Sequence, residues 1–256
     1  CVVHNETSTG CTSRIDEVRR AIDAAGHPAL LLVDTISSLG SIDYRHDEWG
    51  VDVTIGGSQK GLMLPPGLSF NAFSAKALAA NDRATMPRSY WDWREMLASN
   101  ATGYFPYTPA TNLLYGLAEA LAMLFEEGLP NVYARHDRFG EATRRAVRAW
   151  GLGIQCAEPA DCSPVLTGVV MPDGHDADQA GPSQGALPCR LQKYNESRGM
   201  VRKSWCDAGK AYTASERLGL VAGWKDRRVD AQNVETITIS AALVLDRGDD
   251  HLPFRA

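Results

Sequence analysis

The chain has 256 residues, of which 44% are hydrophobic and 22% are charged, and this excludes a wholly disordered protein. The length fits one large domain or a domain and a half. The net charge of -5 provides no basic excess for binding nucleic acid, and no apolar run approaches the roughly 18 residues of a membrane span.

The start of the chain and its cysteines indicate the compartment. No signal-peptide core is recognisable, so we expect a cytoplasmic protein in which the six cysteines are reduced. No spacing of cysteine and histidine fits a zinc site, and no metal is expected. The opening letters CVVHNETSTG read as the end of a strand entering a loop. They predict that the N-terminal part of a longer protein is missing.

The first predicted elements are a helix and a strand. Residues 12–28 have an apolar helical face, with Ser13 and Asp16 as a capping box and Gly26 as a stop signal. Residues 29–34 form a continuous apolar run that ends in a carboxylate. Such a run is typical of a buried parallel strand.

Two more strands follow, at residues 51–57 and 68–74, separated by a segment too rich in glycine and proline to be regular. Helices are predicted at 111–128 and 131–151, and a strand at 163–172. This order predicts an α/β layered fold.

The chain divides near Gly128, where glycine and proline interrupt two helices. We expect residues 1–128 to belong to a large domain and residues 129–256 to a smaller one. After about residue 177 the sequence loses sustained periodicity, and only residues 234–245 look like a strand.

Two residues could carry chemistry. Asp34 ends a buried strand, where it could contact a ligand or cap a following helix, and these two interpretations stay open. Lys60 follows a later strand between glycines and apolar residues. Partial loss of hydration there would favour a nucleophilic amine, although most lysines in loops are solvated surface groups.

The pair is more informative than either residue. Chemistry based on pyridoxal phosphate needs a lysine that bonds to the cofactor aldehyde and an aspartate that keeps the pyridine nitrogen protonated. Asp34 and Lys60, each placed after a strand, meet that need.

Four segments resemble the serine–glyoxylate and alanine–glyoxylate aminotransferases, a group within the class V aminotransferases. They are HNETSTG, LLLVDTISSLG, DEWGVDVTIGGSQKGLMLPPGLSF and GYFPYTPATNLLYGL. The resemblance covers roughly residues 1–177. It implies the type I fold of pyridoxal-phosphate enzymes, with part of a large mixed-sheet domain and a smaller α/β C-terminal domain.

The resemblance also implies roles for individual residues. Lys60 would hold pyridoxal 5'-phosphate covalently and move the substrate proton, and Asp34 would pair with the pyridine nitrogen. Thr7 would contact the ring hydroxyl or the phosphate, Gln59 would lie beside the phosphate, and Ile36 would pack on the ring.

The resemblance further implies a homodimer, in which Tyr107 and Thr108 reach toward the phosphate in the neighbouring subunit. The sequence departs from the family near residue 213. Thr213 stands where the family has the arginine that clamps the substrate carboxylate, and Arg217 lies nearby.

The predicted activity is transfer of an amino group from serine or alanine to glyoxylate. Phosphoserine transamination and cysteine desulfuration are weaker alternatives within class V. A different hypothesis is a non-catalytic fragment, because the phosphate-binding loop and the carboxylate arginine of the family are missing. Visible absorbance with added cofactor distinguishes the enzyme from the fragment.

Overall fold

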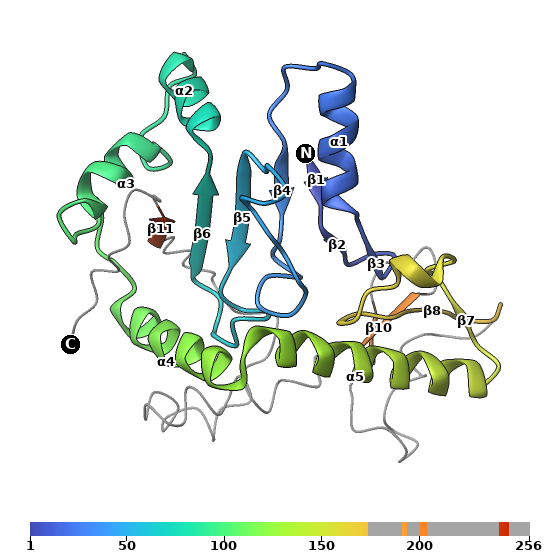
Figure 1. The fold of residues 1–256 in the computed structure, drawn as a ribbon. Coiled ribbons are helices and arrows are strands. Elements are labelled where there is room, and N and C mark those ends of the chain that lie inside the picture. The colour runs from blue at the N-terminus through green and yellow to red at the C-terminus, as the bar shows by residue number, and fades with distance from the viewer. Residues whose placement is uncertain (174–190, 194–199, 204–240, 246–256) are drawn as a thin grey trace.

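The computed structural model describes residues 1–173, 191–193, 200–203 and 241–245. These residues form two main sheets joined by long helices (Figure 1). The helices are α1 (Ile15–Ala24), α2 (Ala75–Arg83), α3 (Trp93–Asn100), α4 (Thr111–Glu127) and α5 (Leu129–Ala149), with a short 3-10 turn at Pro159–Asp161. The strands are β1 (Val2–Val3), β2 (Asn5–Glu6), β3 (Cys11–Thr12), β4 (Leu32–Asp34), β5 (Val53–Gly57), β6 (Leu68–Phe73), β7 (Gly153–Ile154), β8 (Gly168–Val170), β9 (Leu191–Lys193), β10 (Met200–Lys203) and β11 (Ala241–Leu245).

The larger sheet is mixed and has the order β1-β4-β5-β6-β11. Strands β1, β4 and β5 are parallel, β6 is antiparallel to β5, and β11 is parallel to β6. The register pairs Asp34 with Val3 on one side and with Ile55 on the other. The carboxyl ends of three neighbouring strands therefore meet at one edge of the sheet, which confirms the predicted α/β class with a mixed sheet.

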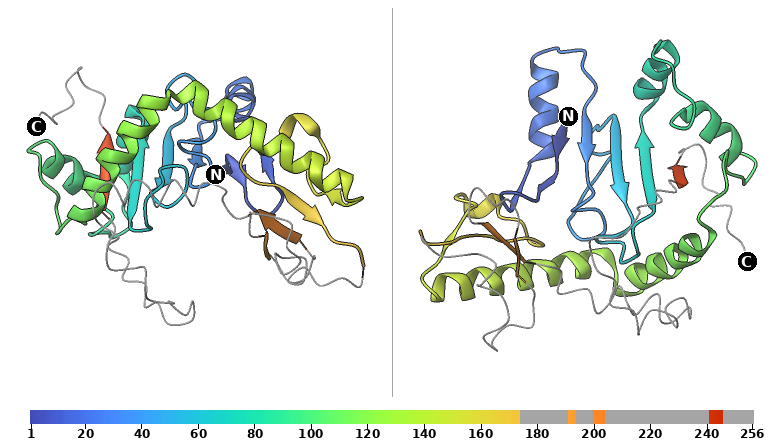
Figure 2. Two further views of the ribbon diagram at one scale, coloured as in Figure 1. Left: turned by 90° about the horizontal axis from the view of Figure 1, so that it is seen from below. Right: turned by 180° about the vertical axis from the view of Figure 1, so that it is seen from behind.

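The smaller sheet has the order β7-β8-β10-β9 and is antiparallel throughout. Helices α4 and α5 run in succession from the larger sheet to the smaller one (Figures 1 and 2). They meet at Gly128, which has a φ of 82°. Val132 and Leu129 at the start of α5 still pack in the core of the larger sheet. The division into 1–128 and 129–256 stays a prediction.

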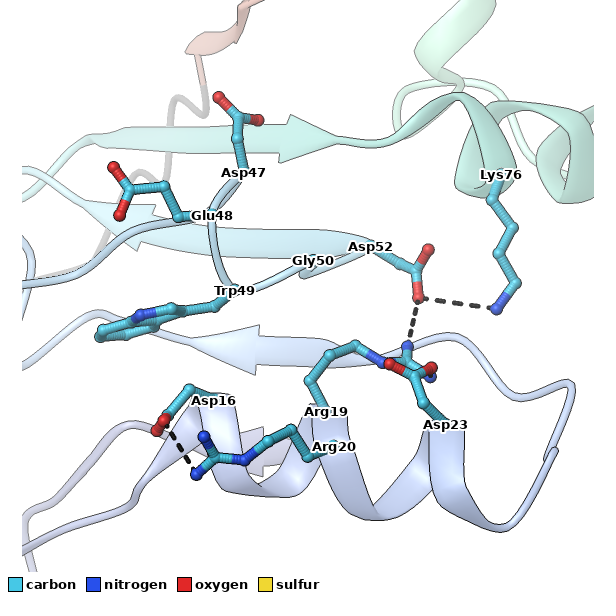
Figure 3. A pocket seen from close by; sticks show the side chains of 10 residues that line it. All are labelled: Asp16, Arg19, Arg20, Asp23, Asp47, Glu48, Trp49, Gly50, Asp52 and Lys76. Carbon is cyan, nitrogen blue, oxygen red and sulfur yellow. Dashed lines mark hydrogen bonds and ion pairs between the residues drawn. The ribbon is translucent and has the colours of Figure 1, made fainter.

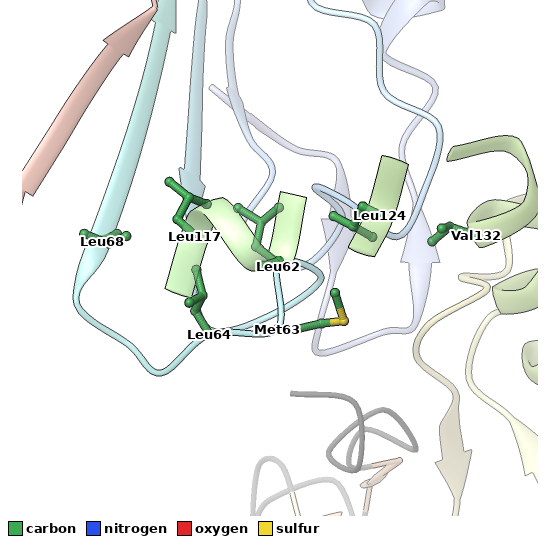
Figure 4. Packing of buried hydrophobic residues seen from close by; sticks show 8 residues of the cluster. Leu62, Met63, Leu64, Leu68, Leu117, Leu124 and Val132 are labelled. Atoms are coloured by element: carbon green, nitrogen blue, oxygen red, sulfur yellow. The ribbon is translucent and has the colours of Figure 1, made fainter. Parts of the chain in front are cut away.

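The main core lies between the larger sheet and α4 (Figure 4). Three consecutive residues of the loop after β5, Leu62, Met63 and Leu64, are buried there against Leu117 and Leu124 of α4. Burial of side chains of this size stabilises the folded state by about 1.5–3 kcal/mol each. The loop that contains Lys60 is thus anchored on its C-terminal side by the core.

The helix predicted at 12–28 is present in shortened form as α1, but its capping box is wrong. The helix begins after Arg14 without a side-chain cap, and Ser13 Oγ donates to the Val3 carbonyl instead. Its stop is as predicted. Gly26 has a φ of 58°, and the Gly26 and His27 N–H groups bond to carbonyls of the last turn.

The strand predicted at 163–172 is mostly wrong, since β8 covers only Gly168–Val170. The buried Ser163 hydroxyl accepts from the N–H groups of Val165 and Leu166, and these contacts form a turn in place of strand pairing. Helices α2 and α3 were not predicted. Of the strand expected at 234–245, β11 covers 241–245 and the rest lies outside the described residues. Among the described residues, every helix is either too short or too polar to serve as a membrane span.

Candidate functional site

Asp34 ends β4 at the carboxyl edge of the larger sheet. Its Oδ1 accepts from the Ile36 N–H at 2.8 Å, and a series of turns follows instead of a helix. The helix-cap interpretation is therefore wrong, although the carboxylate does cap a local turn. Asp34 is exposed, and no other group among the described residues bonds to its carboxylate. One carboxylate oxygen is thus available to a ligand at this edge.

The loop after β1 is bonded to the loop after β4. Thr7 Oγ1 lies 3.1 Å from Ser37 Oγ, and Asn5 Nδ2 donates to the Ser37 carbonyl at 3.2 Å. Behind them, His4 Nδ1 lies 2.9 Å from Ser38 Oγ, and the His4 N–H donates to the Asp34 carbonyl. These bonds fix Thr7 near the backbone that follows Asp34.

His4 is the buried centre of this network. It is 2% exposed, and its ring packs against Tyr44 and Trp49 with centroid distances of 5.2 and 5.9 Å. Burial lowers the pKa of His4 from 6.5 to about 4, and the Asp43 carboxylate opposes that shift only in part. The imidazole is therefore neutral at pH 7. Sequence reasoning missed this positioning residue, because a single histidine near the start of a chain carries no pattern.

Gln59 and Ile36 meet beside Gly57, the last residue of β5. A Cβ added at Gly57 would lie 2.8 Å from Ile36 Cδ1 and 3.1 Å from Gln59 Oε1. Because Gly57 has no side chain, the side chains of Ile36 and Gln59 can both lie beside it. This position is next to β4 and β5, the strand pair that contains Asp34. Gln59 is exposed, so its amide can reach a ligand.

Lys60 is half-buried in a tight turn, and its carbonyl accepts from the Met63 N–H at 2.9 Å. Met63 has a φ of 61° while its side chain is buried. Such a conformation costs on the order of 1–3 kcal/mol and persists only where the surroundings enforce it. On the other side of Lys60, the buried Ser58 hydroxyl donates to the Pro65 carbonyl and accepts from the Leu68 N–H. The lysine loop is held at both ends.

The loops of Asp34 and Lys60 touch through two glycines. A Cβ added at Gly61 would lie 2.2 Å from the Leu39 carbonyl oxygen and 2.3 Å from Ser41 Oγ. A Cβ added at Gly40 would lie 3.2 Å from the carbonyl carbon of Gly61. Only glycine permits this approach, so the distance between the two loops is set by backbone contact.

A cleft of about 660 Å³ lies at the opposite edge, where β4 and β5 begin (Figure 3). Its main feature is Asp52, which is 4% exposed and accepts from the Leu31 N–H at 2.8 Å and the Ser74 hydroxyl at 2.9 Å. Arg19 and Lys76 lie 3.6 and 3.9 Å from it. This cluster ties α1 and α2 to the sheet.

Two of the predicted contact residues precede α4. Tyr107 and Thr108 are exposed in the segment before α4, and the Tyr107 hydroxyl donates to Glu95 at 3.4 Å. Their role toward a neighbouring subunit stays a prediction. Thr213 and Arg217 lie outside the described residues.

Comparison with known proteins decides the family. The sequence profile described as "Aminotransferase class-V" matches residues 1–181. The chain belongs to the class V aminotransferases. Class V aminotransferases of this fold depend on pyridoxal phosphate.

Individual members of the class agree with this assignment. The chain is 58% identical over 183 residues to the serine–glyoxylate aminotransferase of Methylorubrum extorquens, covering 69% of this chain and 45% of the relative. It is 49% identical over 175 residues to the L-aspartate–glyoxylate aminotransferase of Paracoccus denitrificans, covering 68% and 44%. The crystal structure of an alanine–glyoxylate aminotransferase from Nostoc sp. superposes with a TM-score of 0.69 at 30% identity, covering 84% of this chain and 60% of that one. The chain spans about half the length of the curated relatives it matches.

The donor groups at the carboxyl edge fit the cofactor of this class. Asp34 offers an anionic oxygen that suits a protonated pyridine nitrogen, Lys60 an amine that suits an aldehyde, and Thr7 and Gln59 polar groups that suit a hydroxyl or a phosphate. Asp34 ends β4, Gln59 and Lys60 follow β5, and Thr7 lies in the β2–β3 turn that comes after β1. Ligands of open α/β sheets bind at this kind of edge.

Proposed function

We propose that the protein transfers an amino group from a small amino acid to glyoxylate, with serine as the first donor to test and alanine as the second. The observation that carries the proposal is the joining of three loops at one sheet edge, with Asp34 and Lys60 held by the contact between Gly40 and Gly61. Relatives named for serine and for aspartate share glyoxylate as the acceptor, which supports the acceptor more strongly than any one donor.

Lys60, Asp34, Thr7, Gln59 and Ile36 would hold the cofactor in this proposal. When bound, pyridoxal phosphate supplies an electron sink that accepts the electron pair left on the substrate Cα after its proton is removed. The Asp34 carboxylate would accept a hydrogen bond from the protonated pyridine nitrogen. Thr7 and Gln59 would donate to the ring hydroxyl or the phosphate, and Ile36 would cover one face of the ring and exclude water from it.

Lys60 has two tasks in the proposed reaction. Its amine would bind the cofactor in the resting enzyme and, once an amino donor has taken its place, would remove the proton from the substrate Cα. In the reaction with glyoxylate, the same amine would return a proton to the carbon that receives the amino group. The anchored turn from Lys60 to Met63 limits the positions that the amine can take.

The test is formation of hydroxypyruvate from serine and glyoxylate by the purified chain with added pyridoxal phosphate. Lys60→Ala should abolish the reaction, because no other amine would hold the cofactor and move the proton. Lys76→Ala is the matched control, since Lys76 lies at the opposite edge and donates to the Ala29 carbonyl. Equal activity of the Lys60→Ala variant and the parent would overturn the proposal.

Three further features stay predictions. We expect a homodimer in which Tyr107 and Thr108 approach the neighbouring phosphate, and this would appear as twice the chain mass in light scattering. We expect a cytoplasmic location. A chain that stays colourless with excess cofactor would favour the alternative of a non-catalytic fragment.

A further inference from the structure

Three cysteines from distant parts of the sequence meet at the junction of the two sheets. Cys11 lies in β3, Cys156 follows β7, and Cys162 follows the 3-10 turn. Cys11 and Cys162 are partners in an antiparallel bridge. All three are reduced in the structure, and none takes part in the proposed aminotransferase chemistry.

The bridge places the two bridging cysteines directly opposite each other. The Ser163 N–H donates to the Gly10 carbonyl at 2.8 Å, so the hydrogen bond joins neighbours of the two cysteines. That pattern defines a non-hydrogen-bonded antiparallel pair, in which opposite Cα atoms lie about 4.5 Å apart and the side chains share one face. Disulfides need Cα separations of about 4.4–6.8 Å. The backbone therefore permits a bond between Cys11 and Cys162 without rearrangement.

The surroundings distinguish the third thiol from the other two. Cys156 is 6% exposed and its Sγ donates to the Glu158 carbonyl at 3.3 Å. Burial, with hydrogen bonds to the thiols of Cys162 and Cys11, raises the pKa of Cys156 far above its ordinary value. Cys156 therefore stays protonated and unreactive. Cys11 and Cys162 are half-buried, so a small reagent can reach them.

We propose that Cys11 and Cys162 form a reversible disulfide that links the β2–β3 hairpin, which carries Thr7, to the segment that leads into β8 of the smaller sheet. The oxidant is a low-molecular-weight disulfide. The thiolate of one cysteine attacks a sulfur of that disulfide, breaks its S–S bond and releases one thiol. The second cysteine then attacks the protein sulfur of the mixed disulfide and releases the other thiol. Two protein thiols are oxidised, and the external disulfide is reduced to two thiols that carry the two protons.

The link would join parts that already touch. A Cβ added at Gly168 in β8 would lie 3.1 Å from the Thr9 carbonyl oxygen, and Arg14 pairs with Asp161 at 2.8 Å. A covalent bond at this junction would restrict motion of β3 and its loop relative to β8. The proposal is independent of the aminotransferase function, since it needs no cofactor.

The experiment is disulfide mapping of the purified chain after equilibration with oxidised glutathione. We expect a linked pair of peptides containing Cys11 and Cys162, lost on addition of dithiothreitol. The pair should persist in Cys156→Ser and vanish in Cys162→Ser. Oxidation should raise the Tm of the parent by roughly 4–16 °C, because the crosslink closes a long loop, and should leave the Tm of Cys162→Ser unchanged.

Several results would overturn the proposal. One is that both Cys11 and Cys162 can still be alkylated after equilibration with a high concentration of oxidised glutathione. The others are a separate glutathione adduct on each cysteine, or a disulfide between either one and a different cysteine. The mapping of the parent chain decides the matter even if a variant fails to fold.

Discussion

Gly61→Ala tests whether contact between the two loops controls the site. The added Cβ would lie 2.2 Å from the Leu39 carbonyl oxygen, about 1.2 Å less than the 3.4 Å at which ordinary contact begins. The obstructing atom belongs to the backbone, so a rotamer change cannot relieve the clash. The loops carrying Asp34 and Lys60 must therefore separate by about 1 Å. A displacement of that size costs about a hundredfold in rate, and overpacking costs about 1–3 kcal/mol in stability.

The assay compares the parent, Gly61→Ala and Gly153→Ala in urea unfolding and in serine–glyoxylate transamination at saturating cofactor. Gly153 is the matched control, because its added Cβ would lie 3.5 Å from Val170, an ordinary contact. We expect only Gly61→Ala to lose stability and rate. A Gly61→Ala variant within threefold of the parent in rate and within about 0.5 kcal/mol in unfolding free energy would refute the proposed role of the contact.

Three further predictions concern charged or titrating groups. Asp34→Ala should retain the covalent cofactor but lower the transamination rate roughly thirtyfold to several thousandfold, from loss of a contact worth about 2–5 kcal/mol; a loss under threefold would contradict this. The pKa of His4 is about 4 in the folded chain and 6.5 in the unfolded chain, so the unfolded chain is protonated at this residue first as the pH falls. About 3 kcal/mol of the unfolding free energy present at pH 7 should therefore be lost between pH 6.5 and about pH 4. Urea unfolding at pH 7 and pH 4 should show this loss in the parent and a smaller one in His4→Asn. Asp52→Ala should destabilise the fold by about 3–5 kcal/mol, because it leaves the buried Leu31 N–H and the Ser74 hydroxyl without their acceptor and removes the buried carboxylate beside Arg19, whereas Asp16→Ala, at an exposed pair, should cost under about 1 kcal/mol. Equal unfolding free energies of these two variants would contradict that account.

The parallel strands were predictable because their apolar runs are strong and end abruptly. The run before Asp34 and the segment before Gln59 both appear as strands, with bounds shortened by a few residues. Helix α2 was missed because its apolar face is short, so Ser74 became visible as its cap only in the structure, where the hydroxyl accepts from Ala77. The capping box failed because Ser13 finds a closer partner in the Val3 carbonyl. Tertiary contact thus overrode a local signal.

The candidate site, like the fold, was predictable where the signal is local in the sequence and not where it depends on tertiary contacts. Asp34 and Lys60 stood out because each follows a strand, and placement after a strand is visible in the sequence. Their relative positions depend on Gly40 and Gly61, whose close approach joins two loops that are separate in the sequence. His4 was invisible for the same reason, since its bond to Ser38 spans 34 positions. The residues that carry the chemistry could be predicted from the sequence, whereas the contacts that fix their relative positions could be seen only in the folded structure.

The most direct test of the account is the identity of the lysine that binds the cofactor. The chain is loaded with pyridoxal phosphate, reduced with borohydride to make the bond permanent, digested and mapped by mass spectrometry. The account predicts the label on Lys60, and its absence from the Lys60→Ala variant. A label on Lys76 or on any other lysine, with Lys60 unmodified, would contradict it.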